Sequence, residues 1–381
     1  MLLDIVAILF WLSVAALVHT HVTYPLSLAL LARLRPRRKQ RAGPPEEVAA
    51  LPPVSLVIAA HDESSVIERR VLNALESDYP RDLLEVIVTS DGSEDSTVEL
   101  ARTAGADMVL DLSRRGKVEA QNAAVERARG EILAFSDANA FWRPDALRRL
   151  VDALSDPDVG YVCGQVVFTG AGGENQEGAY WRYEMAVRTL ESRLGGVTAG
   201  NGAIYAVRRD AYVVMPSDRG HDLCLPYLTV RAGRRAIYVP EARAEERMAP
   251  TMSGEWERKR RMMNRTWGVL LHDRMLSPRG YGLAYAYEML SHRALRYASP
   301  FLHLVALGAN VALLGEGPVY VLTLAAQLAL LAAAVLGRFV PLLPFRIAAY
   351  YVSVTASIAA GLLDRVRSGP ATTWEPVEGT R

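Results

Sequence analysis

Cysteine is scarce in this chain, which has only Cys163 and Cys224 among its 381 residues. The two lie far apart, form no CxxC pair and have no histidine pattern near them, so the sequence indicates neither a zinc site nor a disulfide framework. We interpret both as reduced packing residues. Such low cysteine use agrees with a reducing compartment.

An excess of charge of either sign is also missing. Lys and Arg total 43 against 42 Asp and Glu, which gives a formal net charge of +1 and no sign of a nucleic-acid-binding surface. Half of the residues are hydrophobic, 22% are charged and the mean hydropathy is +0.08. This average is too apolar for an ordinary soluble enzyme and too polar for a pure membrane bundle, so it predicts a mixture of the two.

The N-terminal segment 1–34 carries almost no charge after Asp4. Its run LLDIVAILFWLSVAALV is long enough to cross a hydrocarbon layer of about 30 Å. A cleaved signal peptide would begin with positive charge, whereas here the basic residues follow the apolar run. The segment therefore predicts an anchor with its N-terminus outside and the following chain in the cytoplasm. The basic residues that follow begin at Arg33 and extend into a basic, Pro-rich linker at 35–53.

From Val54 onward, short β-branched runs alternate with amphipathic stretches. Residues 54–60, 84–90 and 131–137 are predicted as buried strands, with helices around 64–75 and 97–104 between them. This alternation predicts an α/β domain over 54–275 with a mostly parallel sheet and right-handed crossovers. Ligands in such sheets bind beyond the carboxyl ends of the strands.

The C-terminal third is again apolar. Residues 276–298 are predicted as interfacial amphipathic helices, with 288–296 as a basic surface helix, and 299–365 as membrane helices. Within the latter, 301–314 and 319–336 are expected to span the membrane. The stretch 340–363 is interrupted by prolines, so it either spans or lies partly at the interface. Three spans after the domain would place the tail 366–381 outside, but its basic start favours the cytoplasm.

Polar residues follow each of the three predicted strands. Asp62 follows the first strand, Asp91 ends the second, and Asp137-Ala138-Asn139 ends the third. Because the carboxyl ends of parallel strands meet at one edge, these carboxylates are expected to converge on one rim. Lys117, in the loop between the second and third of these strands, could reach a phosphate there.

The order and spacing of these motifs resemble the family-2 glycosyltransferases, whose catalytic domain has the Rossmann-like GT-A fold. VSLVIAAHDESSVI, SDGSEDST, RRGKVEAQNAAV and SDAN are similar to that family's successive nucleotide-sugar motifs. The resemblance implies that Asp62 and Asp91 hold the nucleotide and that Lys117 approaches the diphosphate. It also implies that Asp137 binds Mg²⁺ or Mn²⁺, with Asn139 as a weaker ligand. Many relatives have a second aspartate in place of Asn139.

The segment 180–212 resembles the acceptor side of the same family. The resemblance implies that Trp181 stacks on a sugar ring and that Glu184 accepts its hydroxyl groups. The turn containing Asn201 and Gly202 would let the acceptor approach closely, since glycine adds no side chain. Core packing is the alternative role for the aromatic residue.

The segment 220–242 resembles the part of the family that carries the catalytic base. Asp222 is expected to take the proton of the attacking hydroxyl, which predicts a single displacement with inversion. His221 replaces the preceding acidic residue of the family pattern and is expected either to hydrogen-bond locally, to tune Asp222 or to contact substrate.

The stretch 256–267 occupies the place of the Gln-x-x-Arg-Trp motif of processive members, and it departs from that pattern. Arg261, Arg265 and Trp267 are candidates for contact with the leaving diphosphate, because a guanidinium pairs well with phosphate. The alternative is a basic face that rests on anionic lipid headgroups.

Together these expectations describe a multi-pass plasma-membrane protein with a cytoplasmic catalytic domain. It would transfer a sugar from a nucleotide-sugar donor, expected to be a UDP-sugar, to a growing glycan, like synthases of poly-N-acetylglucosamine, hyaluronan or cellulose. A single transfer to a polyprenyl-phosphate or other lipid-linked acceptor is the alternative. A non-catalytic scaffold is a third hypothesis, which the presence of Asp91, Asp137 and Asp222 together disfavours. The expected partners are donor, acceptor and membrane lipids, with no nucleic acid; the oligomeric state stays open.

Overall fold

The structure is a computed structural model that describes residues 1–34, 51–169, 178–247 and 252–371. Its centre is one eight-stranded sheet with the order β3-β2-β1-β4-β7-β6-β8-β5. The first four strands of that order are parallel, and the predicted strand segments fall within them. They are β3 (Met108–Leu112), β2 (Leu84–Asp91), β1 (Val54–Ala60) and β4 (Ile132–Asp137).

The other half of the sheet is mixed rather than parallel, which the sequence pattern alone did not predict. β7 is antiparallel to both β4 and β6, β6 is parallel to β8, and β5 is antiparallel to β8. These strands are β7 (Tyr205–Arg208), β6 (Val159–Thr169), β8 (Arg235–Arg247) and β5 (Ala140–Trp142). The α/β class with a Rossmann-like parallel half is confirmed.

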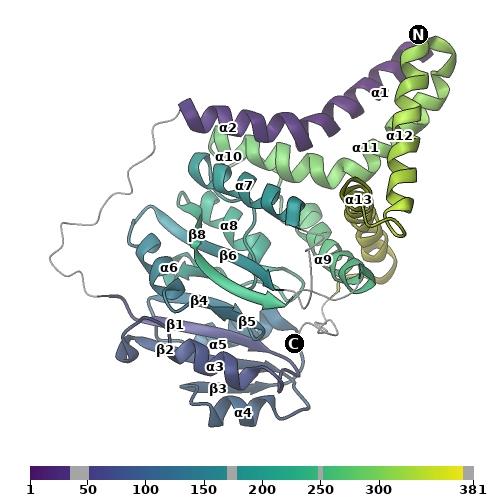
Figure 1. Cartoon of the computed structure of the whole chain (residues 1–381). Coiled ribbons are helices and arrows are strands. Elements are labelled where there is room, and N and C mark those ends of the chain that lie inside the picture. Colours follow the sequence, from purple (N-terminus) through teal and green to yellow (C-terminus); the bar gives the residue numbers. More distant parts are fainter. Residues whose placement is uncertain (35–50, 170–177, 248–251, 372–381) are drawn as a thin grey trace.

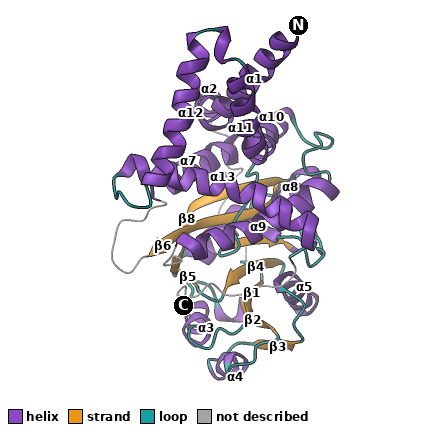
Figure 2. Cartoon of the chain, turned by 90° about the vertical axis from the view of Figure 1, so that its right-hand side faces the viewer, coloured by secondary structure: helices purple, strands orange, loops and turns teal. Residues whose placement is uncertain are grey.

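Helices cover both faces of the sheet, as Figure 2 shows for α3 and α5 on opposite sides of β1 and β2. Alternate residues of β1 enter two separate cores: Leu56 and Ile58 pack in one, and Val57 packs in the other. This explains why β1 is apolar apart from Ser55, since both of its faces are buried. One face carries α3 (Ile67–Leu75), α4 (Thr97–Thr103) and α6 (Ala146–Leu154), and the other carries α5 (Lys117–Arg127) and α8 (His221–Arg231).

A layer of long helices lies beyond the second core (Figure 1). It contains the N-terminal helix, which runs from α1 (Leu2–Val18) through a π-helical turn (His19–Thr23) into α2 (Tyr24–Leu34). α7 (Gly178–Leu194) packs against α2, and α11 (Leu295–Ala312) packs along α1. α10 (Leu283–Glu288) leads into α11 through a second π-helical turn (Met289–Ala294).

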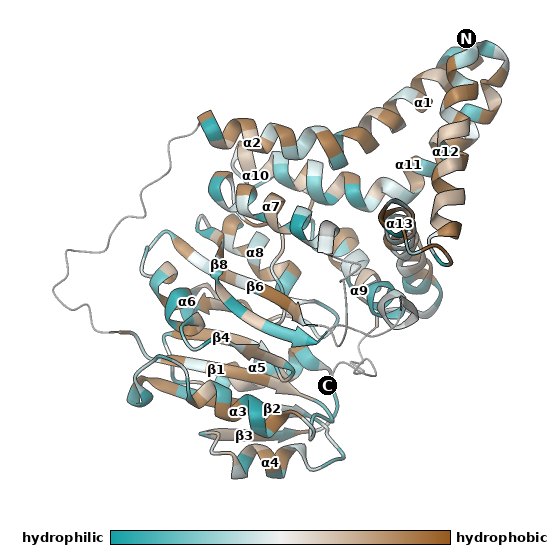
Figure 3. Ribbon diagram, viewed as in Figure 1, coloured by the Kyte–Doolittle hydropathy of each residue, from teal (hydrophilic) through white to brown (hydrophobic). Residues whose placement is uncertain are grey.

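Among the described residues, three helices are long and apolar enough to cross a membrane: Leu2–Leu34, Pro318–Leu336 and Leu343–Ser368. Figure 3 shows how strongly apolar residues gather on these helices. The predicted span 301–314 lies in α11, which is not one of the three because it also includes polar residues such as Arg296. From residue 343 onward, the stretch 340–363 belongs to one continuous helix, α13 (Leu343–Ser368), because Pro344 occupies its first turn, where proline is tolerated.

The segment 288–296 is not the surface helix that its charges predicted. Glu288, His292 and Arg296 are all buried, with at most 8% of each residue's surface exposed. Glu184 on α7 forms an ion pair with Arg296, so the charges are compensated inside the protein rather than by water. The linker segment 35–50 and the tail 372–381 lie outside the described residues.

Gly164 provides a direct test of the packing between β6 and β8, and a second glycine serves as the control. Gly164 lies at a shift in the β6–β8 register, and an added Cβ would overlap the Ala242 carbonyl and lie 3.0 Å from Ile204 Cδ1. Gly164→Ala is therefore expected to lower the free energy of unfolding by about 1–3 kcal/mol. Thermal unfolding in detergent measures this. Gly315→Ala, where an added Cβ meets nothing within 4 Å, is the control and should leave the midpoint unchanged.

Candidate active site at the strand rim

Asp62 and Asp91 organise the loops at the carboxyl ends of β1 and β2. Asp62 has a left-handed backbone (φ 51°), and its Oδ1 accepts a 2.8 Å hydrogen bond from the Glu94 amide. Asp91 is almost fully buried, and its carboxylate accepts hydrogen bonds from the amides of Arg115 and Gly116 at 2.7 and 2.9 Å. Asp91 therefore fixes the loop that leads into α5, whose first residue is Lys117.

Lys117 and Asp137 form an ion pair at the centre of the rim. Lys117 begins α5 and Asp137 ends β4, so the predicted diphosphate and cation residues meet directly. Their side chains are 17% and 21% exposed, which leaves the pair accessible to a ligand. Gly202 lies against it, since an added Cβ would be 3.3 Å from Lys117 Nζ and 3.5 Å from Asp137 Oδ2.

Glu246 is a rim residue that the sequence analysis missed. The antiparallel pairing of β5 with β8 places it opposite Ala140, and its Oε1 lies 3.4 Å from Asn139 Nδ2. Burial, together with the negative charge of Asp137, raises the pKa of Glu246 to about 7. The local sequence holds no signal for this contact, because it depends on the register of two strands about 100 residues apart.

The carboxylate and amide of Asp137 and Asn139 suit a hard divalent cation. No group of three or more His, Cys, Asp or Glu side chains that could hold a metal occurs in the part of the chain that the structure describes. Mg²⁺ and similar ions need no such cage, because they are often bound by one or two carboxylates together with substrate phosphates. The residues at the rim therefore fit a cation that arrives with a diphosphate, and Glu246 adds a third oxygen donor beside Asn139.

Asp222 lies in the first turn of α8, next to the turn formed by residues 198–202. Its carbonyl oxygen accepts a 2.7 Å hydrogen bond from the Gly200 amide. An added Cβ at Gly220 would lie 2.5 Å from Asp222 Oδ1, so the carboxylate folds back over that glycine. The backbone of Asp222 and the Lys117–Asp137 pair are thus linked by a segment only three residues long, 200–202.

The His221 side chain is buried among other side chains of the protein and does not face solvent. Its Nδ1 lies 2.9 Å from the Tyr205 hydroxyl and its Nε2 lies 3.3 Å from the Tyr212 hydroxyl, and the ring packs edge-on against Phe135. Burial, and then the positive charge of Lys117, lower its pKa to about 3. Of the three roles expected for His221, local hydrogen bonding is the one that the structure shows.

The predicted acceptor residues lie in different settings. Trp181 packs against Phe168 and donates its indole N–H to the Val166 carbonyl (3.2 Å). Glu184 is engaged by Arg296, and Asn201 is bonded to Gly164 O (2.8 Å) and to the Ile204 amide (2.9 Å). Gly202 lies beside the Lys117–Asp137 pair, so close that an added Cβ would be 3.3 Å from Lys117 Nζ. The acceptor assignments stay predictions.

The predicted diphosphate residues lie on α9 (Met252–His272), which packs along α13. Trp267 donates its indole N–H to the Ile358 carbonyl (2.8 Å) and so faces α13. Arg265 donates to the Ala371 carbonyl (2.9 Å). Burial lowers the Arg265 pKa, whereas the charge of Asp222 acts in the opposite direction. Arg265 is thus electrostatically coupled to Asp222, and Arg261 lies one helical turn before it.

A three-layer α/β domain with a parallel nucleotide half and an acidic rim is a GT-A-type fold, the class to which the geometry points. Residues 55–214 match the family described as glycosyl transferase family 2. This chain carries a glycosyltransferase family 2 domain.

Solved and curated proteins agree with this assignment. The mannosyltransferase PcManGT from Pyrobaculum calidifontis, solved with GDP-Man and Mn²⁺, is 25% identical, with a TM-score of 0.69; the match covers 94% of this chain and 99% of that one. An N-acetylglucosaminyltransferase of Rhizobium meliloti (strain 1021) is 27% identical over 224 residues, 53% of this chain and 52% of that protein. A beta-monoglucosyldiacylglycerol synthase of Trichormus variabilis is 31% identical over 191 residues, 46% of this chain and 39% of that protein. The chain spans about half or less of the length of these two curated relatives.

The buried state of His221 predicts a pH dependence of stability. Its pKa is lowered on folding, so below about pH 6.5 the unfolded chain takes up a proton that the folded chain does not. The contribution of neutral His221 to the free energy of unfolding is fully present above about pH 6.5 and is lost as the pH falls toward 3. Between pH 7 and 5 the loss is about 2 kcal/mol.

Thermal unfolding of the wild type and His221→Gln at pH 7 and pH 5 tests this. The variant should lose less stability on acidification than the wild type does. His272→Gln, at an exposed histidine, is the control and should follow the wild type. Equal acid sensitivity of all three proteins would contradict the buried neutral state of His221.

Proposed function

We propose that this chain is a membrane-embedded inverting glycosyltransferase that takes its sugar from a nucleotide-diphosphate sugar. One observation carries the proposal: the Lys117–Asp137 pair and the Asp222 peptide are held together by the short segment 200–202. This arrangement offers a cation and a carboxylate to a diphosphate and its metal, and a second carboxylate to an attacking hydroxyl.

In the proposed reaction, Lys117 pairs with the donor diphosphate and Asp91 keeps the Lys117 loop in place. A divalent cation held by Asp137 and Asn139 would neutralise negative charge on the departing nucleoside diphosphate. Asp222 accepts the proton of the acceptor hydroxyl as that oxygen bonds to the anomeric carbon. The bond from this carbon to the diphosphate breaks on the opposite face, so the configuration inverts.

The acceptor is proposed to be a glycan, as in polysaccharide synthases, and the N-acetylglucosaminyltransferase relative supports that choice. A lipid acceptor is the second candidate, because one relative is a beta-monoglucosyldiacylglycerol synthase. The donor is proposed as a nucleotide-diphosphate sugar without a fixed base: the expectation of UDP stands beside a solved relative that binds GDP-Man with Mn²⁺.

Purified protein in lipid nanodiscs should release nucleoside diphosphate from one member of a panel containing UDP-GlcNAc, UDP-Glc and GDP-Man. Release should require Mg²⁺ or Mn²⁺ and stop on chelation. Asp222→Asn should reduce turnover at least 10²-fold with donor affinity unchanged, because a general base contributes about 10²–10⁴-fold. Asp210→Asn, at an exposed carboxylate that pairs with Arg234, is the matched control. Full activity of Asp222→Asn would contradict the proposed base, and mass analysis of the product would separate a glycan ladder from a single-sugar lipid.

The packing of the helices supports a specific topology in the membrane. Phe10 on α1 clusters with Leu313 and Tyr320 at the turn between α11 and α12 (Pro318–Leu336), so the N-terminus and this turn lie at one end of the molecule (Figure 1). The other end of the bundle adjoins the catalytic domain. We propose that α1, α11 and α12 cross the bilayer, although α11 is less apolar than the three candidate spans. In this topology α13, which is itself one of those candidates, stays at the domain surface, held to α9 by the Arg260–Asp364 ion pair. Both the domain and the C-terminus are then cytoplasmic.

Labelling with a membrane-impermeant maleimide tests this topology, since Cys163 and Cys224 are buried and should react little. In intact cells, Gly315→Cys in the exposed α11–α12 turn should be labelled. Ser368→Cys at the exposed end of α13 should be labelled only after permeabilisation. Labelling of Ser368→Cys in intact cells would show that α13 crosses the membrane.

A further inference from the structure

A buried polar cluster stands between the membrane helices and the catalytic rim. We call it the junction cluster, and its members are Tyr24, Glu191, Thr198, His292 and Arg293. Thr198 is fully buried, and its hydroxyl donates to Glu191 Oε2 (3.2 Å) and accepts from Arg293 Nε (2.9 Å). Thr198 is also the first residue of the turn 198–202. The cluster therefore contacts the catalytic segment through the Thr198 side chain.

Of the other members, Glu191 lies on α7, whereas Tyr24, His292 and Arg293 come from the helices that precede and follow the catalytic domain. Glu191 Oε1 accepts from the hydroxyl of Tyr24 on α2 and from His292 Nδ1, both at 2.6 Å. Burial alone would raise the Glu191 pKa, but His292 and Arg293 hold it below its usual value, so the group is a carboxylate. Tyr24 continues the N-terminal membrane helix, and His292 and Arg293 lie in the π-helical turn that begins α11.

The N-terminal helix and the helix that leads into α11 both depart from regular α-helical geometry beside the junction cluster. The π-helical turns His19–Thr23 and Met289–Ala294 face one another, joined by a 2.7 Å hydrogen bond from Thr20 Oγ1 to the Ser291 carbonyl. His19 Nε2 also lies 2.9 Å from Ser291 Oγ. Such π-turns are rare and occur frequently at functional sites. Two of them in contact indicate that helical regularity has been given up in order to place particular side chains.

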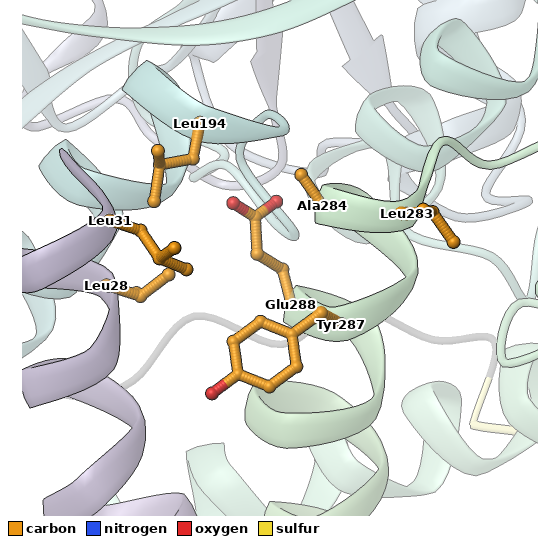
Figure 4. Close-up of a pocket in the computed structure, with 7 residues that line it drawn as sticks. All are labelled: Leu28, Leu31, Leu194, Leu283, Ala284, Tyr287 and Glu288. Atoms are coloured by element: carbon orange, nitrogen blue, oxygen red, sulfur yellow. The ribbon is translucent and has the colours of Figure 1, made fainter. Parts of the chain in front are cut away.

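A neighbouring contact fixes the chain just before the turn. Figure 4 shows the small apolar pocket beside α2 and α10, with the Glu288 carboxylate directed toward the end of α7. Glu288 is fully buried and accepts a 3.0 Å hydrogen bond from the Gly195 amide. The linker 195–198 is thus held at both ends by residues of the segment 288–293.

The turn 198–202 connects Thr198 to the residues of the catalytic rim over a short distance. Thr198 and Gly200 are two residues apart, a chain length of about 7 Å at most. Gly200 donates its amide to the Asp222 carbonyl (2.7 Å), and Gly202 lies against Lys117 and Asp137. A displacement of about 1 Å in such a setting is enough to cost about 10²-fold in rate.

From this geometry we propose that the junction cluster is a positioning device. Tyr24, Glu191 and Arg293 hold Thr198 so that the turn 198–202 keeps Asp222 in register with the Lys117–Asp137 pair. The membrane helices then do more than anchor the protein: their packing sets the geometry of the catalytic rim. The proposal rests on the proposed glycosyl transfer for its kinetic consequences, but not for its structural ones.

Thr198→Val tests the device, because valine keeps the shape and removes the hydrogen bonds of the hydroxyl to Glu191 and Arg293 together with its 3.4 Å contact with His292 Nδ1. We expect kcat to fall about 10²-fold with the affinity for the nucleotide-sugar donor within twofold. Thr198→Ser restores the hydroxyl and should recover most of the wild-type rate. Thr229→Val is the matched control: this buried threonine on α8 has a hydroxyl with no hydrogen-bond partner in the described part of the chain, so its loss should change neither quantity.

Hydrogen–deuterium exchange of the full-length protein in nanodiscs gives a readout that needs no activity. In Thr198→Val, and to a smaller degree in Tyr24→Phe, exchange should rise in peptides covering 198–202 and 219–224, while the sheet strands stay protected as in the wild type. An effect of Tyr24→Phe is decisive, because Tyr24 lies on α2 and its hydroxyl reaches the turn through a hydrogen bond to Glu191 rather than directly.

The outcomes separate the two proposals. If the wild type turns over no nucleotide sugar, the proposed function fails while the exchange experiment still decides the positioning role. The positioning proposal is overturned if Thr198→Val keeps the wild-type kcat and exchange. It is also overturned if Thr198→Val raises exchange throughout the sheet, which would be general unfolding, or if Tyr24→Phe leaves residues 198–202 unchanged.

Discussion

The ion pair between Lys117 and Asp137 is the interaction around which the rim is built. Lys117 reaches it only because Asp91 fixes the backbone of the preceding loop, and Asp137 reaches it only because β4 ends beside β1. A carboxylate and an ammonium group left apart in this half-buried rim would each lose solvation without compensation. Held together, they leave a site that carries both charges that a metal–diphosphate ligand requires.

The parallel half of the fold was predictable because its signals are local. A strand buried on both faces is mostly apolar, as β1 is apart from Ser55, and acidic residues are expected where the strand leaves the core. Asp62, Asp91 and Asp137 mark those points, so their convergence follows from the parallel order. The resemblance to a known family added roles to these residues, but their common location needed only the strand pattern.

The remaining features depend on contacts between distant segments, which no local pattern encodes. Glu246 joins the rim through the register of β8 with β5. The segment 288–296 has the sequence of an amphipathic surface helix, yet Glu184 and Glu191 on α7 compensate its charges, and it becomes buried. Trp267 shows the converse: its place in a motif predicted a ligand contact, and its side chain turns to α13.

The junction cluster is expensive in energy, and this cost bears on its role. Burying Glu191 with Arg293 and His292 removes charged groups from water, and apolar residues of similar size often give equal or greater stability in such positions. Stability alone therefore does not account for the cluster. Charge-assisted hydrogen bonds are directional, however, whereas apolar contacts tolerate sliding. A cluster that must place one threonine beneath a catalytic turn requires that direction, and the two facing π-helical turns supply the side-chain positions that regular helices would not.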